Sequence, residues 1–98
     1  MKKDVEILIR DHIVHVKFGN EFATMIRQPD SNGLRKINFS IPLRGAYADV
    51  IEGSGIASVD NINYEECSIT FRSLPFYETH LIAELITDIL KKHETSNS

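Results

Sequence analysis

Side chains that alternate between apolar and polar along residues 5–18 predict that the chain begins with a β-hairpin. A two-residue turn at Asp11-His12 aligns three apolar pairs on one face: Ile9 with Val14, Ile7 with Val16, and Val5 with Phe18. The same alignment places Glu6 opposite Lys17 on the other face. Because a slip of one residue would lose both matches, the pattern predicts the register as well as the strands.

Further alternation predicts more strands of the same sheet. After a break at Gly19-Asn20, two strands flank the turn-rich stretch 29–33, and Pro42 ends the second of them. Their apolar positions are Ala23 and Met25 on one strand and Ile37, Phe39 and Ile41 on the other. Another strand is expected at 67–71, where Cys67, Ile69 and Phe71 alternate with polar residues. We therefore expect an antiparallel sheet built from hairpins.

The middle of the chain is ambiguous. Residues 43–53 fit helical spacing and strand alternation equally, and we favour an extended segment. Gly53-Ser54-Gly55 is typical of a flexible break, and Asp60-Asn61 of a turn.

An amphipathic helix is predicted near the C-terminal end. Ser73 is a suitable N-cap, Pro75 suits the first turn, and Glu78 suits the positive end of the helix dipole. The apolar stripe consists of Leu81, Ile82, Leu85, Ile86, Ile89 and Leu90. The predicted fold class is α+β, with an antiparallel sheet of about five to seven strands packed against this one helix. We assign residues 1–93 to a single domain and 94–98 to a disordered polar tail.

Charge is distributed unevenly along the chain. From Gly45 to Leu90 there are eight acidic residues and one basic residue, Arg72. An acidic surface repels nucleic acid and favours a cationic protein. We therefore predict a partner-binding surface made of Asp49, Glu52, Asp60, Glu65, Glu66, Glu84 and Asp88. The alternative is that these acids are scattered and only keep the domain soluble.

Candidate chemical sites are weak. His12 and His15 would need His80 or Cys67 to complete a zinc site, so we predict no metal site. We interpret Cys67 as a buried hydrophobic residue rather than a nucleophile. No pattern indicates a cofactor or a catalytic group. The basic residues Arg27, Arg35, Lys36 and Arg44 lack interleaved aromatics, so we interpret them as a solvated face and expect no nucleic-acid binding.

The expected location is the cytoplasm. One cysteine cannot form an internal disulfide, and Glu6 and Arg10 bracket an apolar run too short for a signal peptide. No apolar run is long enough to span a membrane.

These observations lead to two hypotheses about function. The first is a non-catalytic binding domain that neutralises a basic protein, by an analogy of size and charge with toxin immunity proteins and small inhibitors. The alternative is a small-ligand module or minor enzyme, with a pocket between sheet and helix where His15, Tyr47, Tyr64 and His80 converge. A homodimer formed through an exposed sheet edge is compatible with either.

Overall fold

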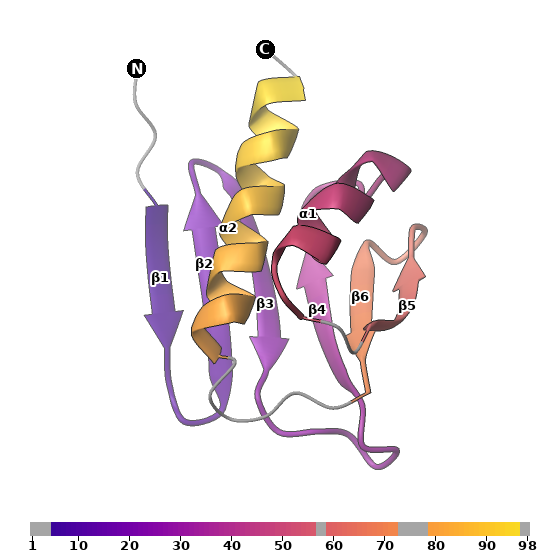
Figure 1. Ribbon diagram of the computed structural model, residues 1–98. Coiled ribbons are helices and arrows are strands. Elements are labelled where there is room, and N and C mark those ends of the chain that lie inside the picture. Colours follow the sequence, from indigo (N-terminus) through magenta and orange to yellow (C-terminus); the bar gives the residue numbers. More distant parts are fainter. Residues whose placement is uncertain (1–4, 57–58, 73–78, 97–98) are drawn as a thin grey trace.

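The described part of the chain folds into an open antiparallel sheet with both of its α-helices on one face (Figure 1). The computed structural model describes residues 5–56, 59–72 and 79–96. The sheet has six strands in the order β1-β2-β3-β4-β6-β5. The strands are β1 (Val5–Ile9), β2 (Ile13–Phe18), β3 (Glu21–Ile26), β4 (Arg35–Phe39), β5 (Val59–Asn63) and β6 (Ser68–Phe71). The helices are α1 (Ala48–Gly53) and α2 (Thr79–Ser96). The predicted α+β class is confirmed.

The predicted register of the first hairpin is confirmed. Strand β1 pairs with β2 so that Ile9 lies opposite Val14 and Glu6 opposite Lys17. The turn closes with a backbone hydrogen bond of 2.9 Å from the Arg10 N–H to the Ile13 carbonyl. Matching apolar side chains on one face, together with a short turn, leave only one favourable register.

The second predicted hairpin is also present. Ala23 of β3 lies opposite Phe39 of β4, and Met25 lies opposite Ile37. Between β2 and β3 the chain reverses at Gly19, whose φ of +64° is a backbone conformation that favours glycine. The sheet then continues from β4 to β6 rather than to β5, because the chain leaves the sheet to form α1 before it returns.

Residues 45–53 are helical, so the extended segment favoured from sequence is wrong. A 3-10 turn (Gly45–Tyr47) leads directly into α1, which ends at Gly53, and Gly55 then adopts a φ of +78°. Buried Tyr47 and Ile51, four residues apart, bring the same side of this segment into the core. Burial of these side chains in the core therefore favours the helix, although the local sequence pattern fits a helix and a strand equally well.

The turn expected at Asp60-Asn61 is wrong as well. These residues lie inside β5, where the pairing with β6 is irregular between Val59 and Asn61. The chain turns instead between β5 and β6, where the Asn63 side chain accepts hydrogen bonds of 3.0 Å from the backbone N–H groups of both Glu65 and Glu66. An asparagine that binds backbone two and three residues ahead is a strong turn former.

Helix α2 carries the predicted apolar stripe. All of the stripe's residues from Ile82 to Leu90 are buried, and Leu81 packs against the core as a partly buried side chain. The cap and first-turn positions proposed for Ser73, Pro75 and Glu78 lie outside the described residues. The helix ends at Ser96, beyond the boundary expected at residue 93. Within the described residues, no helix combines the length and the hydrophobicity required to cross a bilayer.

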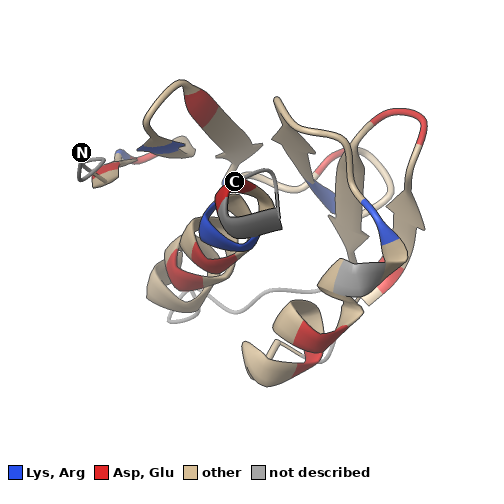
Figure 2. Ribbon diagram, turned by 90° about the horizontal axis from the view of Figure 1, so that it is seen from above, with Lys and Arg blue, Asp and Glu red and all other residues tan. Residues whose placement is uncertain are grey.

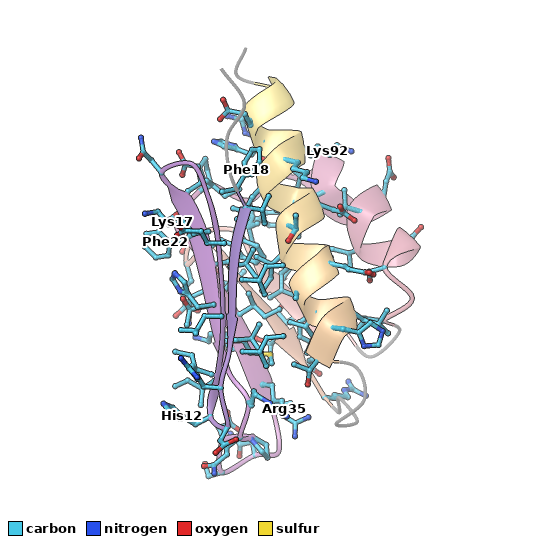
Figure 3. All side chains as sticks on the ribbon, turned by 90° about the vertical axis from the view of Figure 1, so that its left-hand side faces the viewer. His12, Lys17, Phe18, Phe22, Arg35 and Lys92 are labelled. Carbon is cyan, nitrogen blue, oxygen red and sulfur yellow. The ribbon has the colours of Figure 1, made fainter. Side chains whose placement is uncertain are left out.

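The sheet has two very different faces. Side chains such as Val14, Ile37 and Phe71 point toward the helices and are fully buried. Figure 3 shows Lys17 and Phe22 projecting from the opposite face, whereas Phe18 points toward the helix side. No described helix covers that opposite face.

Candidate functional site

A groove lies between the edge strand β1 and helix α2. It has a volume of about 470 Å³. Its lining consists of Ile7, Ile9, His80, Ala83, Glu84, Thr87, Asp88 and Lys91. The groove exists because β1 is the outermost strand while α2 packs mainly over β2 and β3, so the helix does not reach the edge of the sheet (Figure 1).

The floor of the groove is apolar and accessible. Ile7 and Ile9 lie on the helix side of the sheet, opposite Val16 and Val14. Both valines are fully buried, whereas Ile7 is 51% and Ile9 is 44% exposed. Two large aliphatic side chains on the core side of a sheet therefore remain half in water, which is unusual for a position facing a hydrophobic core.

The wall of the groove is acidic. Glu84 and Asp88 are four residues apart on α2, so they lie on the same side of the helix, and both are exposed. Lys91 adds one positive charge, which leaves a formal charge of −1 from these three groups. The hydroxyl of Thr87 donates a hydrogen bond of 2.7 Å to the Ala83 carbonyl and is satisfied within the helix.

The seven predicted binding acids come from three parts of the fold. In Figure 2, α2, α1 and the turn between β5 and β6 each carry acidic segments, and other acidic segments lie elsewhere in the fold. Glu84 and Asp88 line the groove beside β1. Asp49 and Glu52 belong to α1, and Glu52 lines a different hollow, beside β5. The remaining three, Asp60, Glu65 and Glu66, belong to β5 and the following turn.

Two acids of the third group are paired with cations. A carboxylate oxygen of Asp60 accepts a hydrogen bond of 2.7 Å from the Arg72 side chain, and Glu66 accepts one of 2.9 Å from Lys36. Hydrogen bonds from Lys36 and from Ser68 hold the pKa of Glu66 below its usual value. These neighbours reduce the negative potential that the third group can offer to a partner.

The hollow beside α1 is mostly apolar. It has a volume of about 450 Å³. Its lining consists of Ala48, Ile51, Glu52, Gly55, Ile56, Val59 and Ile62. Its polar content among the described residues comes from one carboxylate, Glu52, so it offers little to orient a polar substrate.

The four side chains expected to converge in a ligand pocket lie apart. His15 is on the open face of β2, where Nδ1 lies 2.6 Å from the Thr24 hydroxyl and the ring packs against Phe22. Tyr47 is buried on the helix side, Tyr64 is exposed in the β5–β6 turn, and His80 lines the groove beside β1. The sheet separates His15 from Tyr47 and His80, so these side chains do not converge in one pocket.

Tyr47 instead forms a buried contact between the two helical segments. Its hydroxyl shares a hydrogen bond of 3.1 Å with Nδ1 of His93, near the end of α2. Burial raises the pKa of the Tyr47 hydroxyl, and the charge of Arg44 offsets part of that rise. This contact holds α1 against α2 and has a structural role.

Cys67 lies just before β6 rather than within the strand that was expected to begin there. Its φ is +57°, a left-handed conformation that is uncommon for residues other than glycine. The side chain is partly buried and packs against the core, with Sγ 3.7 Å from the Tyr64 carbonyl. Cys67 is the last residue of the turn in which the Asn63 side chain accepts hydrogen bonds from the backbone N–H groups of Glu65 and Glu66.

The histidines and the basic residues are also distributed over the molecule. In the ranges 5–56, 59–72 and 79–96, no three His, Cys, Asp or Glu side chains are grouped closely enough to hold a metal ion. Arg27 donates a hydrogen bond of 2.9 Å to the Arg10 carbonyl, Arg35 donates one to the Arg27 carbonyl, and Lys36 pairs with Glu66. These contacts use the basic groups to fasten loops and neighbouring strands.

Sequence reasoning missed the β1 edge as part of a site. The available signal was Leu8, an aliphatic residue at a position where alternation calls for a polar one. Leu8 is 42% exposed on the face opposite Ile7 and Ile9, so β1 presents apolar side chains on both of its faces. Such a strand is typical of an edge that pairs with another chain.

Comparison of the chain with protein-family models, with curated proteins and with solved structures finds no match.

Proposed function

We propose that this chain is a non-catalytic protein-binding domain that holds a cationic protein partner, in the manner of an immunity or inhibitor protein. In this proposal the partner docks in the groove between β1 and α2. The observation that carries the proposal is an accessible aliphatic floor, Ile7 and Ile9, beside two carboxylates that are one helical turn apart.

The floor would contribute to the affinity through the burial of its exposed apolar surface. Full burial of an isoleucine side chain is worth about 1.5–3 kcal/mol, so covering the exposed half of Ile7 and of Ile9 would contribute about 1 kcal/mol each. An aliphatic or aromatic side chain of the partner is the natural occupant of this floor.

The carboxylates would supply orientation and speed of association. A lysine or arginine that flanks the partner's apolar anchor would meet Glu84 and Asp88 at the rim of the groove. These two acids are favoured over Asp60 and Glu66, whose carboxylates are already in ion pairs with Arg72 and Lys36. They are favoured over Asp49 and Glu52 because no exposed aliphatic floor like that of β1 adjoins those two on α1 among the described residues.

The test compares two double charge reversals with the same change in net charge. A partner captured from the native host would be purified, and its association and dissociation rates measured with each variant at low and high salt. We expect Glu84→Lys with Asp88→Lys to raise the dissociation rate at least about 10-fold. The matched control, Asp49→Lys with Glu52→Lys, should change it by less than about 2-fold, because it alters only the long-range field.

Two results would contradict the proposal. One is a captured partner that carries a net negative charge. The other is an equal effect of the two charge reversals on the dissociation rate, since that would locate no contact at the groove.

A second candidate is the binding of a small apolar ligand beside α1. The hollow of about 450 Å³ lies within the usual range of ligand pockets, about 300–1,000 Å³. Titration with a dye that fluoresces in apolar surroundings would test it. Saturable binding that Ile51→Trp abolishes, while the fold is retained, would favour this candidate, and absence of binding would remove it.

A further inference from the structure

We propose that two copies of this chain pair through their β1 strands, antiparallel and with Leu8 opposite Leu8 of the second copy, to make one continuous sheet. This self-association goes beyond the proposed binding of a cationic partner, and it uses the backbone edge of β1 rather than the groove above it.

The hydrogen bonds of the first hairpin show which backbone groups of β1 are available. The Arg10 N–H donates to the Ile13 carbonyl, so this pair is bonded across the turn. Bonded pairs alternate along an antiparallel ladder, so Leu8 and Glu6 also bond toward β2. The N–H and C=O groups of Val5, Ile7 and Ile9 therefore point outward, away from the sheet. Figure 3 looks onto this edge.

The two edges of the sheet differ in how they are protected. Strand β5, at one edge, has a register irregularity at Val59/Asn61 and polar residues at Asp60 and Asn63. Such features discourage the addition of another strand. Strand β1, at the other edge, pairs regularly with β2 and contains no proline or lysine. Four of its five residues are large aliphatics with exposures between 37% and 51%.

Geometry restricts the register of two β1 strands. Outward-pointing residues must face outward-pointing residues, so the odd-numbered positions pair with one another. The central options place either Ile7 or Leu8 on the two-fold axis. With Ile7 on the axis, each Glu6 carboxylate faces an apolar Leu8. With Leu8 on the axis, Ile7 pairs with Ile9, Leu8 with Leu8, and Glu6 with Arg10.

Charge complementarity selects the second option. By alternation Glu6, Leu8 and Arg10 share the open face, and all three are exposed. A two-fold axis at Leu8 makes two identical Glu6–Arg10 pairs between the copies and one apolar contact between the leucines. Glu6 already lies opposite Lys17 within its own chain, so its carboxylate would lie between two cations. The β1 edge is thus complementary to itself.

The expected dimer is weak. Pairing confined to one strand in each copy buries less than the roughly 1,200 Å² of a typical stable complex, so we expect a micromolar dissociation constant. Sedimentation from about 5 to 500 µM should show the average mass rising from 11.1 kDa toward twice that value.

The first variant removes an outward donor. Ile7→Pro eliminates an N–H that points away from β2, so it should leave the ladder within the chain in place and keep the protein at 11.1 kDa at every concentration. Ile7→Ala is the matched control, since it removes the side chain but keeps the N–H group. It should still dimerise, with the dissociation constant raised by less than about 10-fold. Circular dichroism of each variant confirms the fold.

The second experiment is a charge swap that does not depend on proline. Glu6→Arg and Arg10→Glu should each weaken the dimer about 10-fold, because like charges then face each other. The double variant restores opposite charges across the axis and should bind within about 3-fold of wild type.

Three results would overturn the inference. A wild-type chain that stays at 11.1 kDa up to about 500 µM excludes the dimer. A folded Ile7→Pro variant that dimerises as wild type does would place the contact elsewhere. A double charge variant that is no tighter than either single variant would exclude the register centred on Leu8.

Discussion

Replacing Tyr47 with phenylalanine removes one hydroxyl from a buried contact and changes little else. The tyrosine is 3% and His93 is 7% exposed, and the two share a hydrogen bond of 3.1 Å. A buried hydrogen bond contributes about 0.5–1.5 kcal/mol net. We therefore expect Tyr47→Phe to lower the free energy of unfolding by about 0.5–1.5 kcal/mol.

Urea denaturation measures this change directly. The urea concentration at the midpoint of unfolding should fall, while the slope of the unfolding free energy against urea concentration stays constant, because the surface exposed on unfolding is the same. For a domain of this size a loss of 1 kcal/mol lowers Tm by about 4–8 °C. Tyr64→Phe is the matched control, since Tyr64 is 49% exposed, and it should change stability by less than about 0.5 kcal/mol. If the two variants are equally stable, the Tyr47–His93 contact does not hold the helices together.

Four further outcomes follow from other contacts. Because burial raises the pKa of Tyr47, its stabilising effect is present below about pH 10 and lost as pH rises through the folded-state pKa, so alkaline unfolding should be shallower in Tyr47→Phe. The pKa of Glu66 is lowered in the folded state, so the stabilisation from its charged carboxylate is present above the unfolded-state pKa and is lost as pH falls. Urea denaturation between about pH 5 and 3 should therefore show a smaller loss of stability in Lys36→Met than in the wild type. At Cys67, with φ of +57°, glycine should be about 1 kcal/mol more stable than alanine in thermal melts, and equal stability would argue against the left-handed turn. Leu85→Ala, in the fully buried stripe, should cost about 2–5 kcal/mol in urea, and a cost below 1 kcal/mol would mean that α2 packs differently.

The elements that sequence reasoning predicted correctly are those whose pattern is local and repeated. In β1 and β2 the side-chain period and a two-residue turn specify register without help from the rest of the chain. In α2 a two-wide apolar stripe fits a helix alone. Residues 45–53 fit two periods, and Asp60-Asn61 has turn composition but lies in a strand. In both places contacts with distant residues outweighed local preference.

The candidate site was less predictable than the fold. The sequence identified Glu84 and Asp88 as members of an acidic set, but their position beside Ile7 and Ile9 depends on where α2 crosses the sheet. At least 75 positions of the sequence separate Ile7 and Ile9 from Glu84 and Asp88, and no local pattern encodes a contact over such a distance. Ion pairs such as Lys36–Glu66, whose members are 30 residues apart in sequence, were likewise not foreseen.

The sequence alone determines that this chain is an antiparallel α+β domain with a defined first hairpin and an acidic C-terminal half. It can do so because side-chain periodicity and charge are properties of neighbouring residues. Tertiary structure decided which strand became the outer edge, which isoleucines remained in water, and how the acids were divided among three places. Those outcomes depend on the strand order and on the position of α2, and both are determined by packing among core residues that are distant in sequence.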